Sequence, residues 1–401
     1  MNILAQHGYG CADRVMRGLD QGLIDGVIFG AKDTGRHKLS EKIEEVRSMH
    51  PNAQCLFDPQ FYASLVAGQN GARLGALVGS EPYPYFAPRR RRDLEREDIV
   101  VSDLRNVLEF QRGLNVTSAI APSIVIPKSL NSVHTVIAKD FLRHARGVWD
   151  ELGGDTPLYA TLAISSAALE DKSELEEFLE EITEIDSRPD GFYLLLEKPD
   201  GAIPDSLTEV NELSRWMLIN YTLKLNGFSV INGYTDLLAP YLGAAGADAV
   251  ASGWFNTLKA FSLKKFEPTD SFARRPVPRY SSAALLKSIR HTELQNIRGL
   301  WPQVMNDEGT DAYYDPEYGS SPEGPQEALQ NWDCLKKMTE DLVTDGDVMD
   351  SLTSCREALD RAAELYAEFN QRGVTLREKS SNQHVAMIRE ELRDFEQLAE
   401  L

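Results

Sequence analysis

The chain has 401 residues, of which 42% are hydrophobic and 26% are charged, the balance of an ordinary soluble globular protein and not of a disordered or fibrous one. Acidic residues outnumber basic ones by 62 to 42, and the formal net charge is −20. A protein that wraps long duplex DNA needs a net basic face, so this balance argues against that function. It leaves room for a local basic patch around a small anion.

The sequence shows neither targeting signals nor paired cysteines. No apolar run is long enough for a transmembrane helix, and the N-terminus lacks a basic region followed by a long apolar one. The four cysteines, Cys11, Cys55, Cys334 and Cys355, are far apart and form no CxxC pair. We therefore expect a cytoplasmic protein with no membrane partner, no signal peptide, no disulfide scaffold, no structural zinc and no other metal site. No motif identifies a cofactor.

Short apolar runs alternate with amphipathic ones over most of the chain. The predicted strands are 2–7, 26–31, 53–58, 117–126, 157–164, 191–197, 228–232 and 248–252, and the helical stretches between them are 11–24, 40–49, 102–113, 131–152, 173–185, 208–226 and 235–245. Such alternation implies parallel strands with right-handed crossovers, and its length matches a (β/α)8 barrel. A doubly wound open sheet is the alternative, but its glycine-rich first turn is matched only in part by His7-Gly8-Tyr9-Gly10.

Two regions interrupt the alternation. Residues 60–100 form a long insertion after the third predicted strand, where barrel loops are usually functional, and we expect them to act as a lid. Residues 301–325 are predicted to be a linker, and 326–401 contain two or three amphipathic helices. The predicted fold is therefore an α/β chain with a (β/α)8 barrel over 1–300 and a C-terminal helical appendage, which packs on the barrel or contacts a partner protein.

The carboxyl ends of barrel strands converge on one mouth, so the residues that end the predicted strands are candidate catalytic groups. Asp58 and Glu197 each end an apolar strand, where burial raises the pKa of a carboxyl group and a neighbouring lysine lowers it. Two carboxyl groups in such surroundings suit general acid–base catalysis near neutral pH. The structural alternative is that Asp58 caps the next loop and Glu197 pairs with a lysine at the rim.

Three further strand-end residues carry reactive nitrogen atoms. Lys32 and Lys198 are candidates for a Schiff-base nucleophile or an electrophilic clamp. His7 is a candidate base, or a metal ligand if the fold brings it beside Asp58 and Glu197. Solvated rim lysines and a hydrogen-bonded structural histidine are the alternatives.

The stretch from Asn232 to Gly253 resembles the last two strand–loop units of phosphate-binding (β/α)8 barrels. In those families these loops bind a phosphate, or the phosphate of flavin mononucleotide, through backbone N–H groups at a short helix N-terminus. The positions that match the phosphate loops are Gly233, Ser252, Gly253 and Asn256. The resemblance implies phosphate binding there, and a flavin-dependent oxidoreductase is one possible consequence. The bulky pair Trp254-Phe255 departs from the pattern and could plug the mouth.

A second, smaller set of residues resembles the tRNA-guanine transglycosylase-like barrels. Asp58 ends the third predicted strand just before Gln60-Phe61, where that family has an aspartate beside a Phe-Gln pair, and Gly246-Ala247-Asp248 is similar to its strand eight. The chain has Ala251 at the position of the family's nucleophilic aspartate, and it lacks the cysteine-rich zinc motif. The resemblance implies either a divergent enzyme or a non-catalytic barrel.

Two basic clusters are expected near the mouth. Arg89 and Arg90 begin a run of four arginines that follows Tyr83 and Tyr85, and Arg275 lies in a basic segment after the last barrel strand. Arginines beside aromatic side chains suit phosphate groups or single-stranded nucleic acid, so these three are candidate anion ligands. The alternative is a solvated stretch, because acidic residues follow the arginine run at once.

These observations favour an enzyme that acts on an anionic substrate, phosphate-bearing or nucleotide-like, by acid–base chemistry at the barrel mouth. Lyase, isomerase and glycosidic-bond reactions all stay open. The alternative is a transglycosylase-like barrel without catalysis that serves as a binding or structural subunit of a nucleic-acid-handling assembly, with a protein partner on its C-terminal helices.

Overall fold

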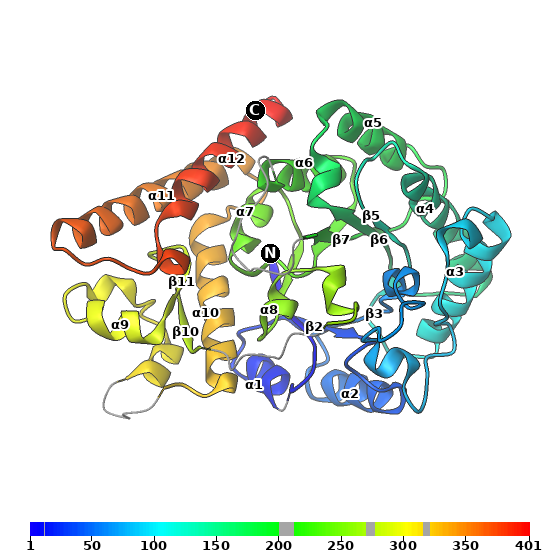
Figure 1. The fold of residues 1–401 in the computed structure, drawn as a ribbon, viewed down its shortest axis with the longest axis horizontal. Helices are drawn as coiled ribbons and strands as arrows, with labels where there is room; N and C mark the ends of the chain where they lie inside the picture. Colours follow the sequence, from blue (N-terminus) through cyan, green and yellow to red (C-terminus); the bar gives the residue numbers. More distant parts are fainter. Residues whose placement is uncertain (12, 200–211, 270–276, 316–320) are drawn as a thin grey trace.

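The computed structural model describes residues 1–11, 13–199, 212–269, 277–315 and 321–401. Its centre is a parallel β-barrel (Figure 1) whose strands are β1 (Asn2–Gln6), β2 (Gly26–Gly30), β3 (Gln54–Asp58), β4 (Ala119–Ala121), β5 (Val125–Ile126), β6 (Leu158–Ser165), β7 (Gly191–Glu197), β8 (Ser229–Asn232) and β9 (Ala249–Ser252). The strand order is β3-β2-β1-β9-β8-β7-β6-β4, and a parallel bridge between Leu56 and Ser118 joins its two ends. The predicted (β/α)8 barrel is confirmed. The fourth predicted strand is split into β4 and β5, which both pair with β6.

Strands β2, β7 and β9 are buried along their whole length, which is why they read as continuous apolar runs instead of alternating ones. Glycines occur where neighbouring backbones approach most closely. A Cβ atom on Gly26 would lie 2.2 Å from the carbonyl oxygen of Gln54, and one on Gly191 would lie 2.2 Å from that of Ser229. Any larger residue at these two positions would push adjacent strands apart.

Helices cover the outside of the barrel. They are α1 (Arg14–Asp20), α2 (Arg36–Met49), α3 (Glu97–Arg112), α4 (Val133–Glu151), α5 (Lys172–Thr183), α6 (Glu212–Leu225), α7 (Ala239–Ala244) and α8 (Asn256–Lys259), with short 3-10 helices η4 (Ser166–Leu169) and η5 (Asp236–Leu238). The start of α5 is fixed by Asp171, whose carboxylate accepts the N–H groups of Ser173 and Glu174.

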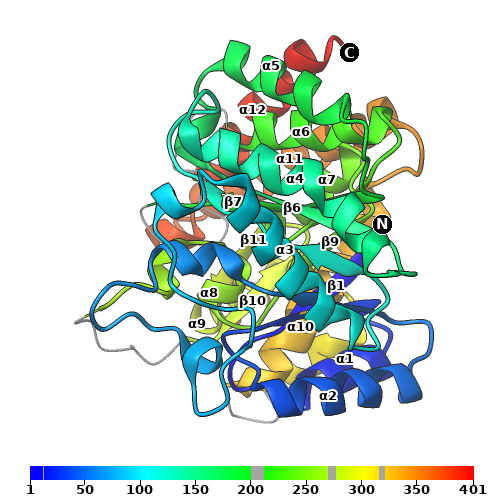
Figure 2. The same ribbon diagram turned by 90° about the vertical axis from the view of Figure 1, so that its right-hand side faces the viewer.

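The insertion after β3 folds back onto the barrel. It contains η1 (Phe61–Leu65), η2 (Gly75–Val78) and η3 (Arg91–Asp93). Tyr83 and Tyr85 are buried and pack against Phe57 of β3 and Phe110 of α3. Figure 2 shows the insertion, in light blue, at the same end of the barrel as α8 and away from the N-terminus. It is therefore placed at the end where the carboxyl termini of the strands meet.

The C-terminal elements lie along one side of the barrel (Figure 1). They are β10 (Arg279–Ser282), β11 (Lys287–Arg290), α9 (His291–Ile297), η7 (Pro302–Val304), η8 (Gly309–Tyr314), α10 (Gly324–Leu342), α11 (Val348–Gln371), η10 (Glu378–Ser380) and α12 (Gln383–Ala399). The short helix η6 (Leu263–Lys265) precedes them and lies at the barrel mouth. Helix α10 packs on α1, α7 and β10, and α12 packs on α6. The indole N–H of Trp332 in α10 donates to the carbonyl oxygen of Ser252 in β9 at 2.9 Å. The predicted helical appendage is thus fastened directly to a barrel strand.

The antiparallel hairpin of β10 and β11 was absent from the sequence prediction. Its strands are short and rich in serine and basic residues, a composition that lacks the apolar signal of the barrel strands. Among the described residues, no helix is both long and apolar enough to cross a membrane.

Candidate functional site

Asp58 lies at the carboxyl end of β3 and is buried at the barrel mouth. Its Oδ1 accepts the backbone N–H of Gln60 at 2.9 Å, and its Oδ2 accepts the hydroxyl groups of Tyr62 at 2.9 Å and Tyr193 at 3.4 Å. Burial raises the pKa of this carboxyl group, while Lys265 and the three hydrogen bonds oppose the rise. Asp58 therefore caps the loop that follows it, through the Gln60 N–H, and also binds two tyrosine hydroxyl groups.

Two residues of the mouth have left-handed backbone conformations without being glycine. Gln60, two residues after the end of β3, has φ 50°, and Tyr234, two residues after the end of β8, has φ 59°. The side-chain oxygen of Gln60 accepts the backbone N–H of Lys32 at 2.7 Å, which links the ends of β2 and β3. Backbone strain of this kind costs about 1–3 kcal/mol per residue and concentrates at functional sites.

Lys265, in η6, brings an amine to the same place. Its Nζ donates to the hydroxyl of Tyr234 at 2.7 Å and lies 4.2, 5.3 and 5.0 Å from the ring centroids of Tyr234, Phe261 and Phe266. Burial lowers the pKa of Lys265 to about 7, with Lys32 acting in the same direction and Asp58 and Asp33 opposing it. We call Asp58, Tyr62, Tyr193, Tyr234 and Lys265 the mouth cluster.

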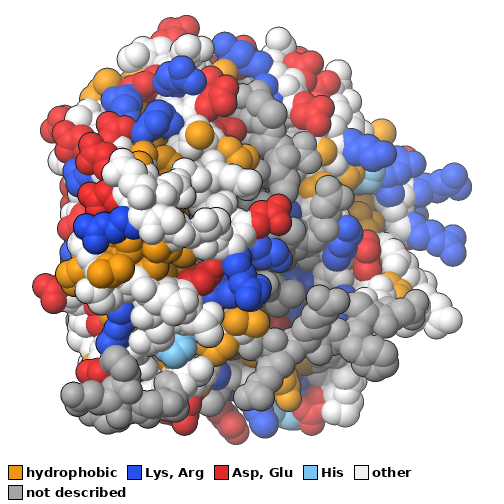
Figure 3. Space-filling model, turned by 60° about the vertical axis from the view of Figure 1, so that its left-hand side comes forward, with side chains coloured by type: hydrophobic (Ala, Val, Ile, Leu, Met, Phe, Trp, Pro, Cys, Tyr) orange, Lys and Arg blue, Asp and Glu red, His pale blue; other side chains and the backbone are white. Residues whose placement is uncertain are grey.

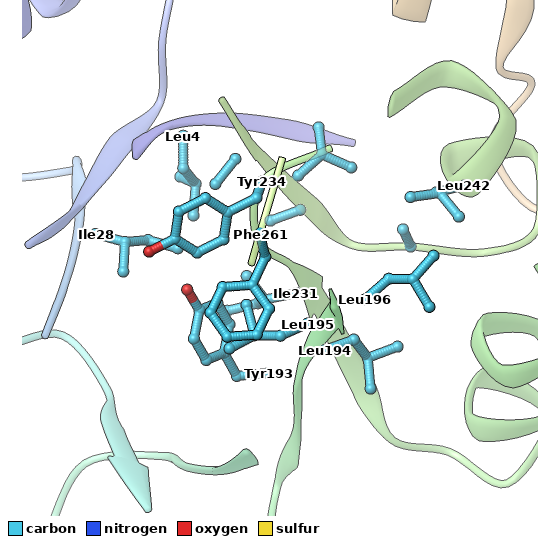
Figure 4. Close-up of a cluster of buried hydrophobic side chains, with 14 of the residues drawn as sticks. Leu4, Ile28, Tyr193, Leu194, Leu195, Leu196, Ile231, Tyr234, Leu242 and Phe261 are labelled. Atoms are coloured by element: carbon cyan, nitrogen blue, oxygen red, sulfur yellow. The ribbon is translucent and has the colours of Figure 1, made fainter. Parts of the chain in front are cut away.

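The three tyrosines of the mouth cluster are proton donors at any physiological pH, because burial raises the pKa of each hydroxyl well above its usual value. Figure 4 shows Tyr193 and Tyr234 with their hydroxyl groups pointing to the same side of the barrel interior, and the ring of Phe261 packs against that of Tyr234. The Tyr234 hydroxyl also faces Tyr62 and Gln60. The cluster thus forms a continuous set of groups from the amine of Lys265 to the carboxyl of Asp58.

Residues 261–267, the cover segment, close this part of the mouth. The N–H of Lys198 donates to the carbonyl oxygen of Phe261 at 2.9 Å, and Lys32 Nζ donates to that of Lys265 at 2.6 Å. The exposed Arg73 donates to three carbonyl oxygens of the segment, those of Lys264, Phe266 and Glu267, at 2.6 to 2.8 Å. The plug of the mouth is therefore Phe261 and its neighbours and not the predicted Trp254-Phe255, of which Trp254 lies against Tyr9 and His7.

The other predicted catalytic residues lie around this cluster with partners of their own. Glu197 is buried, accepts the N–H of Leu263 in the cover segment at 3.4 Å, and has a pKa raised by burial. Lys198 forms a buried ion pair with Glu212 at 2.8 Å. Lys32 is half-buried and rests over the ring of Phe266. The structure thus brings Lys32, Asp58 and Glu197 to the cover segment, while Lys198 is paired on the α6 side.

His7 is buried and held by a separate set of contacts. Its Nδ1 lies 3.2 Å from the hydroxyl of Thr34 and its Nε2 lies 3.4 Å from Nζ of Lys42. Burial, reinforced by the charge of Lys42, lowers the pKa of His7 to about 3, so the ring is neutral at physiological pH. Among the described residues, no group of three His, Cys, Asp or Glu side chains could hold a metal ion. Neutral His7 therefore has the partners of a structural histidine.

The residues matched to phosphate loops are tightly packed in this structure. A Cβ atom on Gly233 would lie 2.7 Å from the hydroxyl of Tyr193, and one on Gly253 would lie 2.6 Å from the carbonyl oxygen of Gln6. Ser252 donates from its hydroxyl to Asp236 at 3.2 Å. Asn256 begins the four-residue helix α8. Close packing of the barrel accounts for both glycines, and phosphate binding by these four residues stays a prediction.

The predicted arginine ligands differ in their surroundings. Arg89 donates two hydrogen bonds to the buried carboxylate of Asp103, from Nε to Oδ2 at 2.8 Å and from Nη2 to Oδ1 at 2.6 Å. Arg90 is exposed beside Asp93, and Arg275 lies outside the described residues. Figure 3 shows basic side chains projecting from the right-hand edge of the surface, with acidic and further basic side chains scattered over the rest. The guanidinium group of Arg89 is thus already bound to a carboxylate of the chain itself.

The sequence analysis missed Tyr62, Tyr193, Tyr234 and Lys265 as functional candidates. Tyr193 lies inside an apolar strand and looks like a core residue, and Lys265 follows the last strand by more than ten residues. A weak signal was present, since the Lys264-Lys265 pair is enclosed by Phe261 and Phe266. Two lysines between aromatic residues after a barrel strand indicate a partly desolvated amine.

Comparisons with known proteins identify no family for this chain. No protein-family model and no curated protein matches the chain. Among solved structures, it is similar to GH10 from Paenibacillus barcinonensis, with 10% identity and a TM-score of 0.38 over 66% of this chain and 88% of that one. It is also similar to dihydrodipicolinate synthase from Oceanobacillus iheyensis, with 10% identity and a TM-score of 0.33 over 100% and 97% of the two chains. The carboxyl transferase domain of Rhizobium etli pyruvate carboxylase matches with 11% identity and a TM-score of 0.36, over 98% and 62%.

These likenesses are distant. They identify no family and no substrate. Function has to be argued from the mouth cluster itself.

Proposed function

We propose that this chain is an enzyme that performs acid–base chemistry on a small anionic substrate at the carboxyl end of its barrel, with Lys265 as the base and Asp58 on the proton-donating side. The observation that carries the proposal is the 2.7 Å contact between Nζ of Lys265 and the hydroxyl of Tyr234, beside the buried carboxyl group of Asp58. A lysine and an aspartic acid whose surroundings alter both pKa values form a usable acid–base pair near neutral pH.

Stability alone gives no reason for this arrangement. Within the described residues, no carboxylate oxygen lies within ion-pair distance of Lys265, although the amine is enclosed by three aromatic rings. Desolvating an amine without such a partner is costly, and an apolar side chain would fill the same space at lower cost. Costs of this kind, together with the strained backbone at Gln60 and Tyr234, are typical of functional sites.

The anionic character of the substrate is supported by Lys32. Its ammonium group has three donors, and the described residues use one of them, for the carbonyl oxygen of Lys265. The two remaining donors suit a carboxylate or phosphate that enters beside the cover segment. For entry the segment has to move, and the contacts from Arg73 that hold it lie at the surface, where water can replace them.

The test is a survey of turnover with small phosphorylated and carboxylated aldehydes, ketones and hydroxy acids, followed by proton NMR in heavy water. A substrate should show exchange or conversion that falls about a hundredfold or more in Lys265→Met and in Asp58→Asn. The exposed neighbour provides the matched control, Lys264→Met, which should keep the rate of the unaltered protein. Turnover that persists within a few-fold in Lys265→Met would rule out Lys265 as the base.

The closed mouth favours one alternative, a barrel that binds without catalysis. Phe261 fills the space between Tyr62 and Tyr234, with ring centroids 5.0 and 5.5 Å away. If the cover segment never opens, no compound of the survey will be converted, and the C-terminal helices α10 to α12 then become the surface on which to look for a protein partner.

A further inference from the structure

The surroundings of the Lys265 amine are those expected for a nucleophile. Its nearest polar partner in the described part of the chain is the hydroxyl of Tyr234, an oxygen that can both accept a proton from nitrogen and donate one. The rings of Tyr234, Phe261 and Phe266 surround it with electron-rich faces. These faces favour a positive charge on the nitrogen. They form no covalent bond or ion pair with it, so no such bond has to be broken before the amine attacks a substrate.

We propose that Lys265 forms an imine with its substrate, so that the substrate class is small aldehydes and ketones that carry a carboxylate or a phosphate. This inference rests on the proposed function and specifies the substrate of the same site. An iminium ion keeps the positive charge where the ammonium group of Lys265 now lies. The three aromatic rings and Asp58 that accommodate the ammonium ion therefore also accommodate the iminium ion.

The bonding changes balance within the mouth cluster. The lone pair of the neutral amine forms a bond to the carbonyl carbon, and the π electrons move to the carbonyl oxygen, which takes a proton from the Tyr234 or Asp58 side of the cluster. The nitrogen of the carbinolamine then returns one proton to the mouth cluster. The cluster passes this proton to the carbinolamine hydroxyl group, which leaves as water while the C=N bond forms. No oxidant, reductant or further reactant is needed.

Trapping with glyoxylate and sodium cyanoborohydride tests this inference on the full-length protein. Cyanoborohydride reduces an imine to a secondary amine, so glyoxylate leaves a carboxymethyl group on each lysine that formed one. We expect carboxymethylation of Lys265 at pH 7 to be about tenfold faster or more than that of the exposed Lys264, as read from peptide fragmentation spectra. The labelling rate of Lys265 should rise with pH around a midpoint near 7, whereas surface lysines follow a midpoint near 10.5.

Tyr234→Phe is the second variant, because it removes the hydroxyl that positions the amine while keeping the ring. It should slow labelling of Lys265 and leave that of Lys264 unchanged. Labelling of Lys265 that is no faster than that of Lys264, or that needs denaturant, overturns the imine. If turnover in heavy water still requires Lys265 while trapping fails, only this inference is refuted and the role of Lys265 as a base stands. If turnover is also independent of Lys265, both proposals fail.

Discussion

Nζ of Lys265 and the hydroxyl of Tyr234 meet at 2.7 Å although the two residues belong to different strand–loop units. Tyr234 lies two residues after the end of β8, and its left-handed backbone turns the ring into the barrel. Lys265 follows β9 and reaches the same point through the cover segment. Adjacent barrel strands therefore determine this contact, as expected where the carboxyl ends of parallel strands converge.

Replacing Lys265 by methionine should change how stability depends on pH. The pKa of Lys265 is about 7 in the folded chain and near 10.5 when unfolded, so between these values the unfolded state binds the additional proton. The free energy of unfolding should thus rise with pH from 7 to 10.5 in the unaltered protein. This contribution amounts to about 1.4 kcal/mol per pH unit at most. Lys265→Met should lack it, and urea unfolding from pH 6 to 9 will measure the difference in slope. Equal slopes would contradict a depressed pKa.

Removing Arg89 should destabilise the protein strongly. Its two hydrogen bonds neutralise Asp103, whose side chain is 1% exposed. Arg89→Met leaves this carboxylate buried and unpaired, and we expect a loss of about 3–5 kcal/mol in the free energy of unfolding. Arg92→Met at an exposed position of the same run is the control and should change stability little. Chemical denaturation measures both, and a double variant with Asp103→Leu should recover part of the loss.

The barrel could be predicted from sequence because its strands are buried on all sides. Continuous apolar runs such as 191–197 are bounded by polar and glycine-rich turns, and their alternation with amphipathic stretches leaves few other topologies. The same reasoning selected Asp58 as a candidate, because a carboxyl group at the end of an apolar strand stands out in the sequence.

The mouth cluster could not be predicted in the same way. Tyr193 is one aromatic residue in a strand of apolar ones, and only the fold shows that its hydroxyl reaches Asp58. Lys265 lies in a cover segment whose path depends on contacts with distant residues, among them Arg73 and Lys32, and no periodicity encodes those contacts. Gly233 and Gly253 show a different difficulty. Close packing and phosphate binding both require glycine, so the sequence alone cannot distinguish the two reasons.

Gly253→Ala tests whether close packing, and not phosphate binding, requires a glycine at this position. Its Cβ atom would lie 2.5 Å from Cβ of Leu258 and 2.6 Å from the carbonyl oxygen of Gln6, so backbone has to shift. We expect a cost of about 1–3 kcal/mol and a lower Tm in the absence of any ligand. Gly299→Ala is a matched control, because nothing lies within 4 Å of the added atom. A Gly253→Ala protein with an unchanged Tm would show that packing does not require this glycine.

His7→Gln should make the protein less sensitive to acid. The pKa of His7 is about 3 in the folded chain and near 6.5 when unfolded, so between these values only the unfolded state binds the proton. The free energy of unfolding therefore falls as the pH falls from 6.5 to 3, by up to about 1.4 kcal/mol per pH unit for this residue.

His384, whose pKa is lowered to about 4, acts in the same direction, and Asp58, whose pKa is raised, acts in the opposite one. Glutamine retains a polar group that can contact Thr34 and Lys42 but does not titrate. As the pH is lowered from 7 to 4, the urea midpoint should consequently fall less steeply in His7→Gln than in the unaltered protein. The difference should be close to the contribution of one proton, and the slope that remains comes in part from His384. Identical slopes in the two proteins would mean that His7 already binds its proton in the folded state, and that burial beside Lys42 does not keep the ring neutral.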